Sequence, residues 1–339
     1  MKVSAECSAR IANASLVAAV AVVLLHLCLA GPAAEGSPVW LFVRDFARFA
    51  VPFFFLVSGF LIAGHAAEPG WWARETLKRV RSLLVPYVGW SALFGLYLLV
   101  GVAVPELHRT HGFDVVAWWR EKDLLLFGLD LRQMPLMLPL WYLRTLFLLV
   151  LVSGVLVRAV RRWGMATLFG FGAVYLAYAV SVDWRPDLTV TTVGSLLRAT
   201  FAPEAFFCFV AGLWLRLNGL EPKPRKAVPF LAVAAVLLVV RQLVGPWLPY
   251  PVVLPFAIYG VWCAVPATPW PKALTGLSFP IYLLHWFGVH LLARSWPEQA
   301  GSPVALPLVF ASVVVKAVLV TAVLRRLAPR WADRLFGGR

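Results

Sequence analysis

Charged residues are scarce in this 339-residue sequence, where Asp, Glu, Lys and Arg together make up only 14%. About a quarter of the residues in a soluble domain are charged, so this chain has too few charges to cover a surface that faces water. It is instead 61% hydrophobic, with a mean hydropathy of +0.80. This composition excludes a soluble enzyme and a disordered chain, and it predicts an all-α polytopic membrane protein.

Cysteine is also scarce. The four cysteines are Cys7, Cys28, Cys208 and Cys263, and their spacing matches neither a disulfide framework nor a metal site. A secreted domain built on disulfides is therefore excluded, and we expect no metal centre. Cysteine within an apolar run behaves as a small apolar residue.

Acidic residues are outnumbered, because 16 Asp and Glu face 31 Lys and Arg, which gives a net charge of +15. In a soluble protein this excess would suggest a nucleic-acid partner. Here the cations lie mostly in short loops between apolar runs, where they determine membrane orientation. We therefore expect the lipid bilayer, and no nucleic acid, as a partner.

Long apolar runs are abundant, and each is close to the roughly 20 residues that cross a bilayer as a helix. The sequence predicts ten transmembrane helices. They cover residues 11–30, 39–64, 83–103, 138–157, 164–182, 195–216, 227–248, 251–266, 274–294 and 304–324. We expect the first run to be retained as a span, because it is longer than the apolar core of a signal peptide.

The orientation follows from the distribution of Lys and Arg. With the N-terminus inside, inner segments hold 19 of these residues and outer segments hold 7. Both termini are therefore expected in the cytoplasm of a multi-pass cell-membrane protein. Residues 1–339 should form a single membrane-embedded domain. Its segment 104–137 should face outward and lie partly on the bilayer surface, because Trp118 and Trp119 stand there among charges.

Several ionisable residues fall within the predicted spans, where each costs about 2.5–3.5 kcal/mol on insertion scales and is therefore a candidate functional residue. The predicted topology places five of them in the outer half of the membrane. They are His26, Arg44, Arg48, Arg144 and Glu204. This shared depth predicts a polar cavity in the outer half of the bundle, with His26 beside it.

Structural explanations compete with this reading. Arg44 could be interfacial, and Glu204 could be no more than a counter-ion for Arg44 and Arg48, which share a helix face at i and i+4. A lone buried histidine is usually a hydrogen-bonded packing residue, which applies to His26 and His285.

Five local sequences follow one another along nearly the whole chain. They are VVLLH (22–26), ARFAVPFFFLVSGFLI (47–62), KRVRSLLVPY (78–87), PLWYLRTLFLLV (139–150) and LSFPIYLLHWF (277–287). In this order the chain resembles integral-membrane acyltransferase family 3, the O-acyltransferases of bacterial polysaccharides and related acceptors. It is most similar to the compact branch that lacks an appended esterase-like domain.

The resemblance implies transfer of an acyl group, usually acetyl, from acyl-CoA to a hydroxyl of a sugar, a glycan or a secondary metabolite. Acetyl-CoA or another acyl-CoA would be a donor substrate, with no permanently bound cofactor. His26 would act as the general base, or would be acylated transiently. The other catalytic candidates are Arg48, Arg144 and Glu204. The two arginines could stabilise the oxyanion, which needs nearby positive charge.

The candidate substrate-binding residues are Arg44, Ser58, Lys78, Arg79, Arg81 and His285. The three cations at 78–81 could hold the CoA phosphates, or could merely anchor the loop on the inner side. Ser58 and Gly59 could let the donor arm pass closely, or could let two helices pack.

One position departs from the family pattern. Many members carry an arginine eleven residues before the first-span histidine, whereas this chain has Ser15, and its nearest arginine is Arg10. We expect either an altered donor site or a divergent member of the family.

Two other function classes compete. A small-solute transporter could use intramembrane Arg, Glu and His for ion coupling and binding, and a lipid-binding scaffold would have no turnover. The five ordered motifs favour the acyltransferase, which alone would consume acyl-CoA and release a free thiol.

Overall fold

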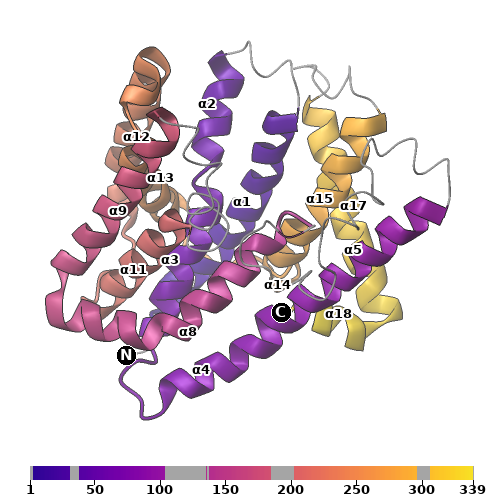
Figure 1. Ribbon diagram of the computed structural model, residues 1–339, viewed down its shortest axis with the longest axis horizontal. Coiled ribbons are helices and arrows are strands. Elements are labelled where there is room, and N and C mark those ends of the chain that lie inside the picture. Colours follow the sequence, from indigo (N-terminus) through magenta and orange to yellow (C-terminus); the bar gives the residue numbers. More distant parts are fainter. Residues whose placement is uncertain are drawn as a thin grey trace.

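The protein is a bundle of helices, seen here in a computed structural model that describes residues 3–30, 38–103, 135, 137–184, 202–295 and 306–338 (Figure 1). These residues contain no β-strand. A helix occupies each of the ten predicted apolar segments, in whole or in part. They are α1 (Ala5–Ala30), α2 (Pro38–Ala47) with α3 (Ala50–Ala63), α5 (Val85–Ala103), α8 (Leu140–Trp163), α9 (Met165–Trp184), α11 (Pro203–Leu217), α12 (Ala227–Val244), α13 (Tyr250–Ala264), α15 (Ser278–Ser295) and α17 (Leu306–Leu327).

Shorter helices connect or follow these segments. They are α4 (Trp71–Arg79), a π-helical turn (Val80–Leu84), two 3₁₀ turns (Pro224–Lys226 and Gly245–Trp247), α14 (Lys272–Thr275) and α18 (Pro329–Leu335). The predicted outward segment 104–137 lies outside the described residues except at positions 135 and 137. Residues 195–201 of the predicted sixth span also lie outside them.

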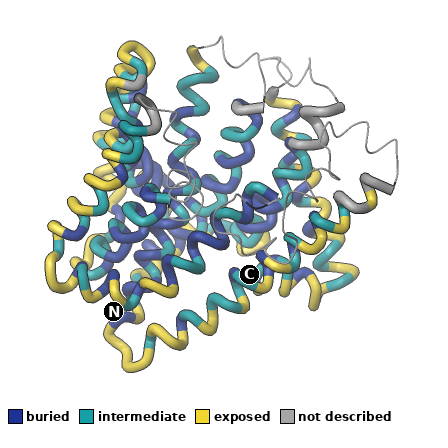
Figure 2. Tube along the Cα trace, in the orientation of Figure 1, coloured by how far each residue is buried: buried dark blue, intermediate teal, exposed yellow. Residues whose placement is uncertain are grey.

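Five helical stretches are long and apolar enough to cross a membrane. They are Ala5–Cys28, Pro38–Ala63, Leu140–Trp163, Pro224–Val244 and Pro307–Leu327. Large apolar side chains are also exposed on the outer faces of α12 and α17, among them Leu243 and Leu327 (Figure 2). Such surfaces are unfavourable in water and favourable against lipid. The prediction of a helical membrane protein is confirmed, while the count of ten crossings and the cytoplasmic termini stay predictions.

The predicted span 39–64 is broken into α2 and α3 at Arg48 and Phe49. Pro52 lies four residues after Arg48. It has no N–H to donate to the Arg48 carbonyl, and its ring would press against that carbonyl. The break is therefore a local consequence of one proline.

The closest packing in the described bundle joins α3 to α11. A Cβ atom on Gly59 would overlap the backbone carbonyl of Phe209, and one on Gly212 would overlap the carbonyl of Leu56. The two glycines let the helix backbones touch, which is the usual role of small residues between membrane helices. α3 is thereby fixed near the buried centre of the bundle (Figure 2).

The π-helical turn Val80–Leu84 connects α4 to α5. Val85 donates its N–H to the Val80 carbonyl, five residues back. Pro86, which follows at once, lacks the N–H for an α-helical bond to the Ser82 carbonyl, so the wider turn fits the sequence. Arg81 lies within this turn, whereas Lys78 and Arg79 lie in the last turn of α4.

Candidate active site

A cavity of about 500 Å³ lies at the end of the bundle where α1 begins. Five elements besides α1 contribute to its wall: α3, α4, α8, α14 and α15. Its polar lining includes Ser15, Ser58, Arg79, Lys272 and Ser278, and its aromatic lining includes Phe54, Tyr142, Phe279 and Tyr282. We call this space the donor cavity, after the donor substrate that the sequence resemblance implies. It combines two cations, several hydroxyls and a row of rings.

Arg79 is held in the wall of the donor cavity by an acidic residue on its own helix. The buried carboxylate of Glu75 lies 3.7 Å from the Arg79 guanidinium and 3.7 Å from the Lys78 ammonium group. Lys272 is the first residue of α14 and contributes the second cation. Two cations in one concave wall attract anionic ligands such as phosphates.

The structure divides the three cations that the sequence groups together. Arg79 lines the donor cavity with Ser58, whereas Lys78 and Arg81 line a second cavity of about 680 Å³ with Arg74 and Arg334. Neighbouring residues on a helix point about 100° apart, so consecutive cations can serve different spaces. The π-helical turn adds to this divergence.

Arg10 does not contribute to the lining of the donor cavity. It is buried, and its guanidinium donates hydrogen bonds to the carbonyls of Cys263 and Val265 at the end of α13. Ser15 does line the cavity, and its hydroxyl donates to the Ile11 carbonyl at 2.7 Å. Lys272, which was not among the predicted site residues, supplies positive charge in the same lining as Ser15.

His26 on α1 and His285 on α15 lie side by side, although 258 residues separate them in the chain. Their ring centroids are 5.1 Å apart, and the Trp286 ring stands edge-on to His26 at 5.7 Å. His285 is fully buried. Extensive contact between α1 and α15 brings the two imidazoles together.

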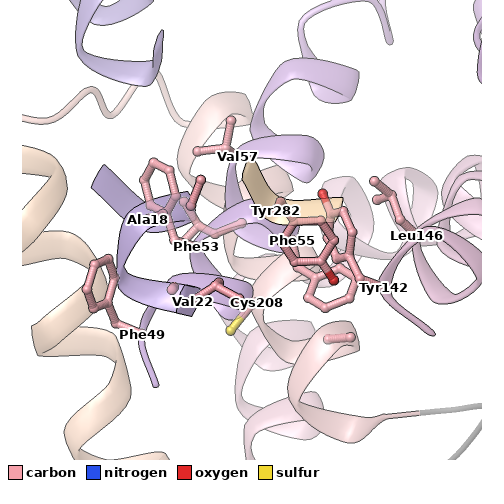
Figure 3. Packing of buried hydrophobic residues seen from close by; sticks show 14 of the residues in the cluster. Ala18, Val22, Phe49, Phe53, Phe55, Val57, Tyr142, Leu146, Cys208 and Tyr282 are labelled. Atoms are coloured by element: carbon pink, nitrogen blue, oxygen red, sulfur yellow. The ribbon is translucent and has the colours of Figure 1, made fainter. Parts of the chain in front are cut away.

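The histidine pair follows the donor cavity along the same two helices. Tyr282 lines the cavity, and His285 lies one turn further along α15, with ring centroids 5.9 Å apart. The rings of Phe55, Tyr142 and Tyr282 lie against one another beside this path (Figure 3). Seven residues of helix, or ~10 Å, separate Ser278 in the cavity wall from His285.

The arginines of α2 form a separate polar cluster. The Asp45 carboxylate lies 3.0 Å from Arg44 and 3.6 Å from Arg48, and Tyr250 donates its hydroxyl to the Asp45 carbonyl at 2.8 Å. Arg48 also lies over the Tyr250 ring and interacts electrostatically with Glu204. Asp45 is therefore a counter-ion of both arginines, a role for which the sequence suggested Glu204.

Arg144 occupies a third place. It is buried on α8 and is hydrogen bonded to Tyr87 on α5. The sequence grouped His26, Arg44, Arg48, Arg144 and Glu204 by depth, yet none of them belongs to the lining of the donor cavity. Their contacts fall into three groups, and their roles stay predictions.

Comparison with known proteins gives a consistent result. A family model described as an acyltransferase domain matches residues 16–326, which include both histidines and most of the cavity wall. The chain is also 29% identical over 319 residues to the succinoglycan biosynthesis protein ExoH of Rhizobium meliloti (strain 1021), covering 86% of this chain and 80% of that protein. No solved structure matches the chain significantly.

Proposed function

The chain belongs to acyltransferase family 3, and we propose that it is a membrane O-acyltransferase moving an acyl group, in the simplest case acetyl, from acyl-CoA to a hydroxyl of a glycan. The similarity to a succinoglycan biosynthesis protein supports a polysaccharide acceptor. The observation that carries the proposal is the donor cavity, whose cations lie at one level of α1 and α15 while the histidines follow on the same helices.

The donor cavity suits the chemistry of acyl-CoA. Arg79 and Lys272 would bind its phosphates by charge-assisted hydrogen bonds. Ser15, Ser58 and Ser278 offer hydroxyls to the amide groups of the pantetheine arm. The arm would then pass Tyr282 and bring the thioester toward His26.

The reaction needs a base and a charge that stabilises an oxyanion. His26 would accept the proton of the acceptor hydroxyl as its oxygen attacks the thioester carbonyl. The C–S bond then breaks, and the departing CoA sulfur takes up a proton and leaves as the free thiol. We assign the stabilisation of the oxyanion to Arg144, a buried cation of α8.

The acceptor would approach from the opposite end of the bundle. α1 and α2 lie side by side there, with the end of α1 and the start of α2 toward the same end of the bundle (Figure 1). The cluster of Arg44, Asp45, Arg48 and Glu204 offers donors and acceptors suited to sugar hydroxyls. Donor and acceptor would thus meet between the two ends, at the histidines.

The test is thiol release from acetyl-CoA by the purified protein in detergent, with glycans extracted from the native cells as acceptor. We expect release by the wild type and by His65→Gln, an exposed histidine control, and none above background by His26→Gln. Solute flux without thiol release would contradict the proposal and would favour a transporter.

A further inference from the structure

The imidazole of His285 has a defined tautomer. Its Nδ1 lies 2.5 Å from the carbonyl oxygen of Tyr282. A carbonyl oxygen can only accept a hydrogen bond, so Nδ1 carries the proton and donates. In a neutral imidazole the other nitrogen, Nε2, is then left with a lone pair and can only accept.

This acceptor is buried and unused. Nε2 of His285 has no hydrogen-bond partner among the described residues, and the side chain is 0% exposed. An unsatisfied buried acceptor lowers the stability of the folded protein, because it has lost its hydrogen bonds to water and gained none. Native proteins keep few such atoms, and each calls for an explanation such as a catalytic role.

The ring that can satisfy it is His26. A hydrogen bond between two imidazoles, with the nitrogens about 3 Å apart, separates the ring centroids by ~5 Å. The observed separation is 5.1 Å, with the ring planes inclined by 32°. Rotation of the His26 ring could therefore make the bond without moving α1 or α15. The Tyr282 hydroxyl cannot serve, because it already donates to the Pro139 carbonyl at 2.7 Å.

We propose that His285 is a positioning residue for His26: its Nε2 accepts a hydrogen bond from one nitrogen of His26 and so directs the lone pair of the other nitrogen toward the acceptor hydroxyl. This inference rests on the proposed function. One proton moves, from the hydroxyl to His26 and then to the departing CoA sulfur, and none passes to His285. The Tyr282 carbonyl and His285 together hold the base in one tautomer, the role that a carboxylate fulfils in a catalytic triad.

Two substitutions separate this role from its rivals. Glutamine can offer an oxygen near the position of Nε2, whereas phenylalanine fills the space without an acceptor. We expect His285→Phe to lower kcat for thiol release about 100-fold with little change in KM for acetyl-CoA, and His285→Gln to stay within about tenfold of the wild type. If His285 were itself the base, both variants would be equally inactive. If it only packed, both would keep their kcat, and either pattern overturns the proposal.

A second measurement does not depend on activity, so it tests the inference even if the proposed function fails. In protein with ¹⁵N-labelled histidine rings, nitrogen chemical shifts report the tautomer of each imidazole, and the His26→Gln and His285→Phe variants assign the two rings. We expect His285 protonated at Nδ1 and His26 in one tautomer, which becomes mixed in His285→Phe. His285 protonated at Nε2, or a His26 signal unaffected by His285→Phe, would overturn the inference.

Discussion

The donor cavity and the histidine pair lie on the same two helices, α1 and α15, yet their polar atoms have opposite surroundings. Around the cavity, Ser15, Arg79 and Lys272 line an open space of about 500 Å³. At the histidine pair, His285 is sealed among packed side chains with one acceptor unsatisfied. Under the proposed function the donor cavity binds the donor and the histidine pair takes part in the reaction, so substitutions should separate KM from kcat.

The largest expected effect is at the histidine pair. His26→Gln should lower kcat about 10²- to 10⁴-fold, because general-base catalysis contributes about that much. KM for acetyl-CoA should change little, since His26 does not line the donor cavity. Steady-state thiol release over a range of acetyl-CoA concentrations measures both. A raised KM with an unchanged kcat would contradict separate roles for the donor cavity and the histidine pair.

The cavity cations should show the reverse pattern. Lys272→Gln or Arg79→Gln should raise KM for acetyl-CoA about 10- to 100-fold with kcat nearly unchanged, because each removes a charge-assisted hydrogen bond. The same titration, repeated at increasing ionic strength, should raise the wild-type KM as well.

Two comparisons sharpen this result. Lys78 and Arg81 line the second cavity. The double variant Lys78→Gln, Arg81→Gln should therefore raise KM for acetyl-CoA less than Lys272→Gln does. Arg225→Gln removes an exposed cation outside the linings of both cavities and serves as the matched control. An equal rise of KM in Lys272→Gln and Arg225→Gln would assign the effect to overall charge.

Gly59→Ala changes the face of α3 that packs against α11. The new methyl group would overlap the Phe209 carbonyl, so we expect a loss of about 1–3 kcal/mol of stability from overpacking. The measurement is the thermal unfolding midpoint in detergent, with Gly95→Ala, which meets no atom within 4 Å, as the control. Equal midpoints for the two variants would show that α3 and α11 can separate without cost.

Ser58→Ala should have the smallest effect. It removes one neutral hydroxyl from the donor cavity and should raise KM about 2- to 10-fold without lowering the unfolding midpoint. Two adjacent residues of α3 would then have different roles, since Ser58 would affect donor binding and Gly59 would affect stability. A midpoint loss in Ser58→Ala as large as in Gly59→Ala would assign Ser58 to packing.

The helices were predictable because each apolar run is a local property of the sequence. The break at Arg48 was also predictable from Pro52, four residues on, although 39–64 was predicted as one span. The π-helical turn beside Pro86 is less apparent from sequence, because a proline at that place also fits the first turn of an ordinary helix.

The site was less predictable, because its residues meet only through packing. Arg79 separates from Lys78 and Arg81 by direction around a helix whose register the π-helical turn changes. Lys272 stands in a four-residue helix without any motif. His26 and His285 were each identified as candidates, but nothing in the sequence near either residue predicted their contact.

The contact of Gly59 with α11 has a consequence for how such an enzyme can change over generations. One wall of the donor cavity is α3, whose backbone is locked from behind and tolerates little substitution on that side. Another part of the wall is α14, a helix of only four residues. New donor preferences would therefore arise most cheaply by mutation around Lys272, while α3 is inherited almost unchanged.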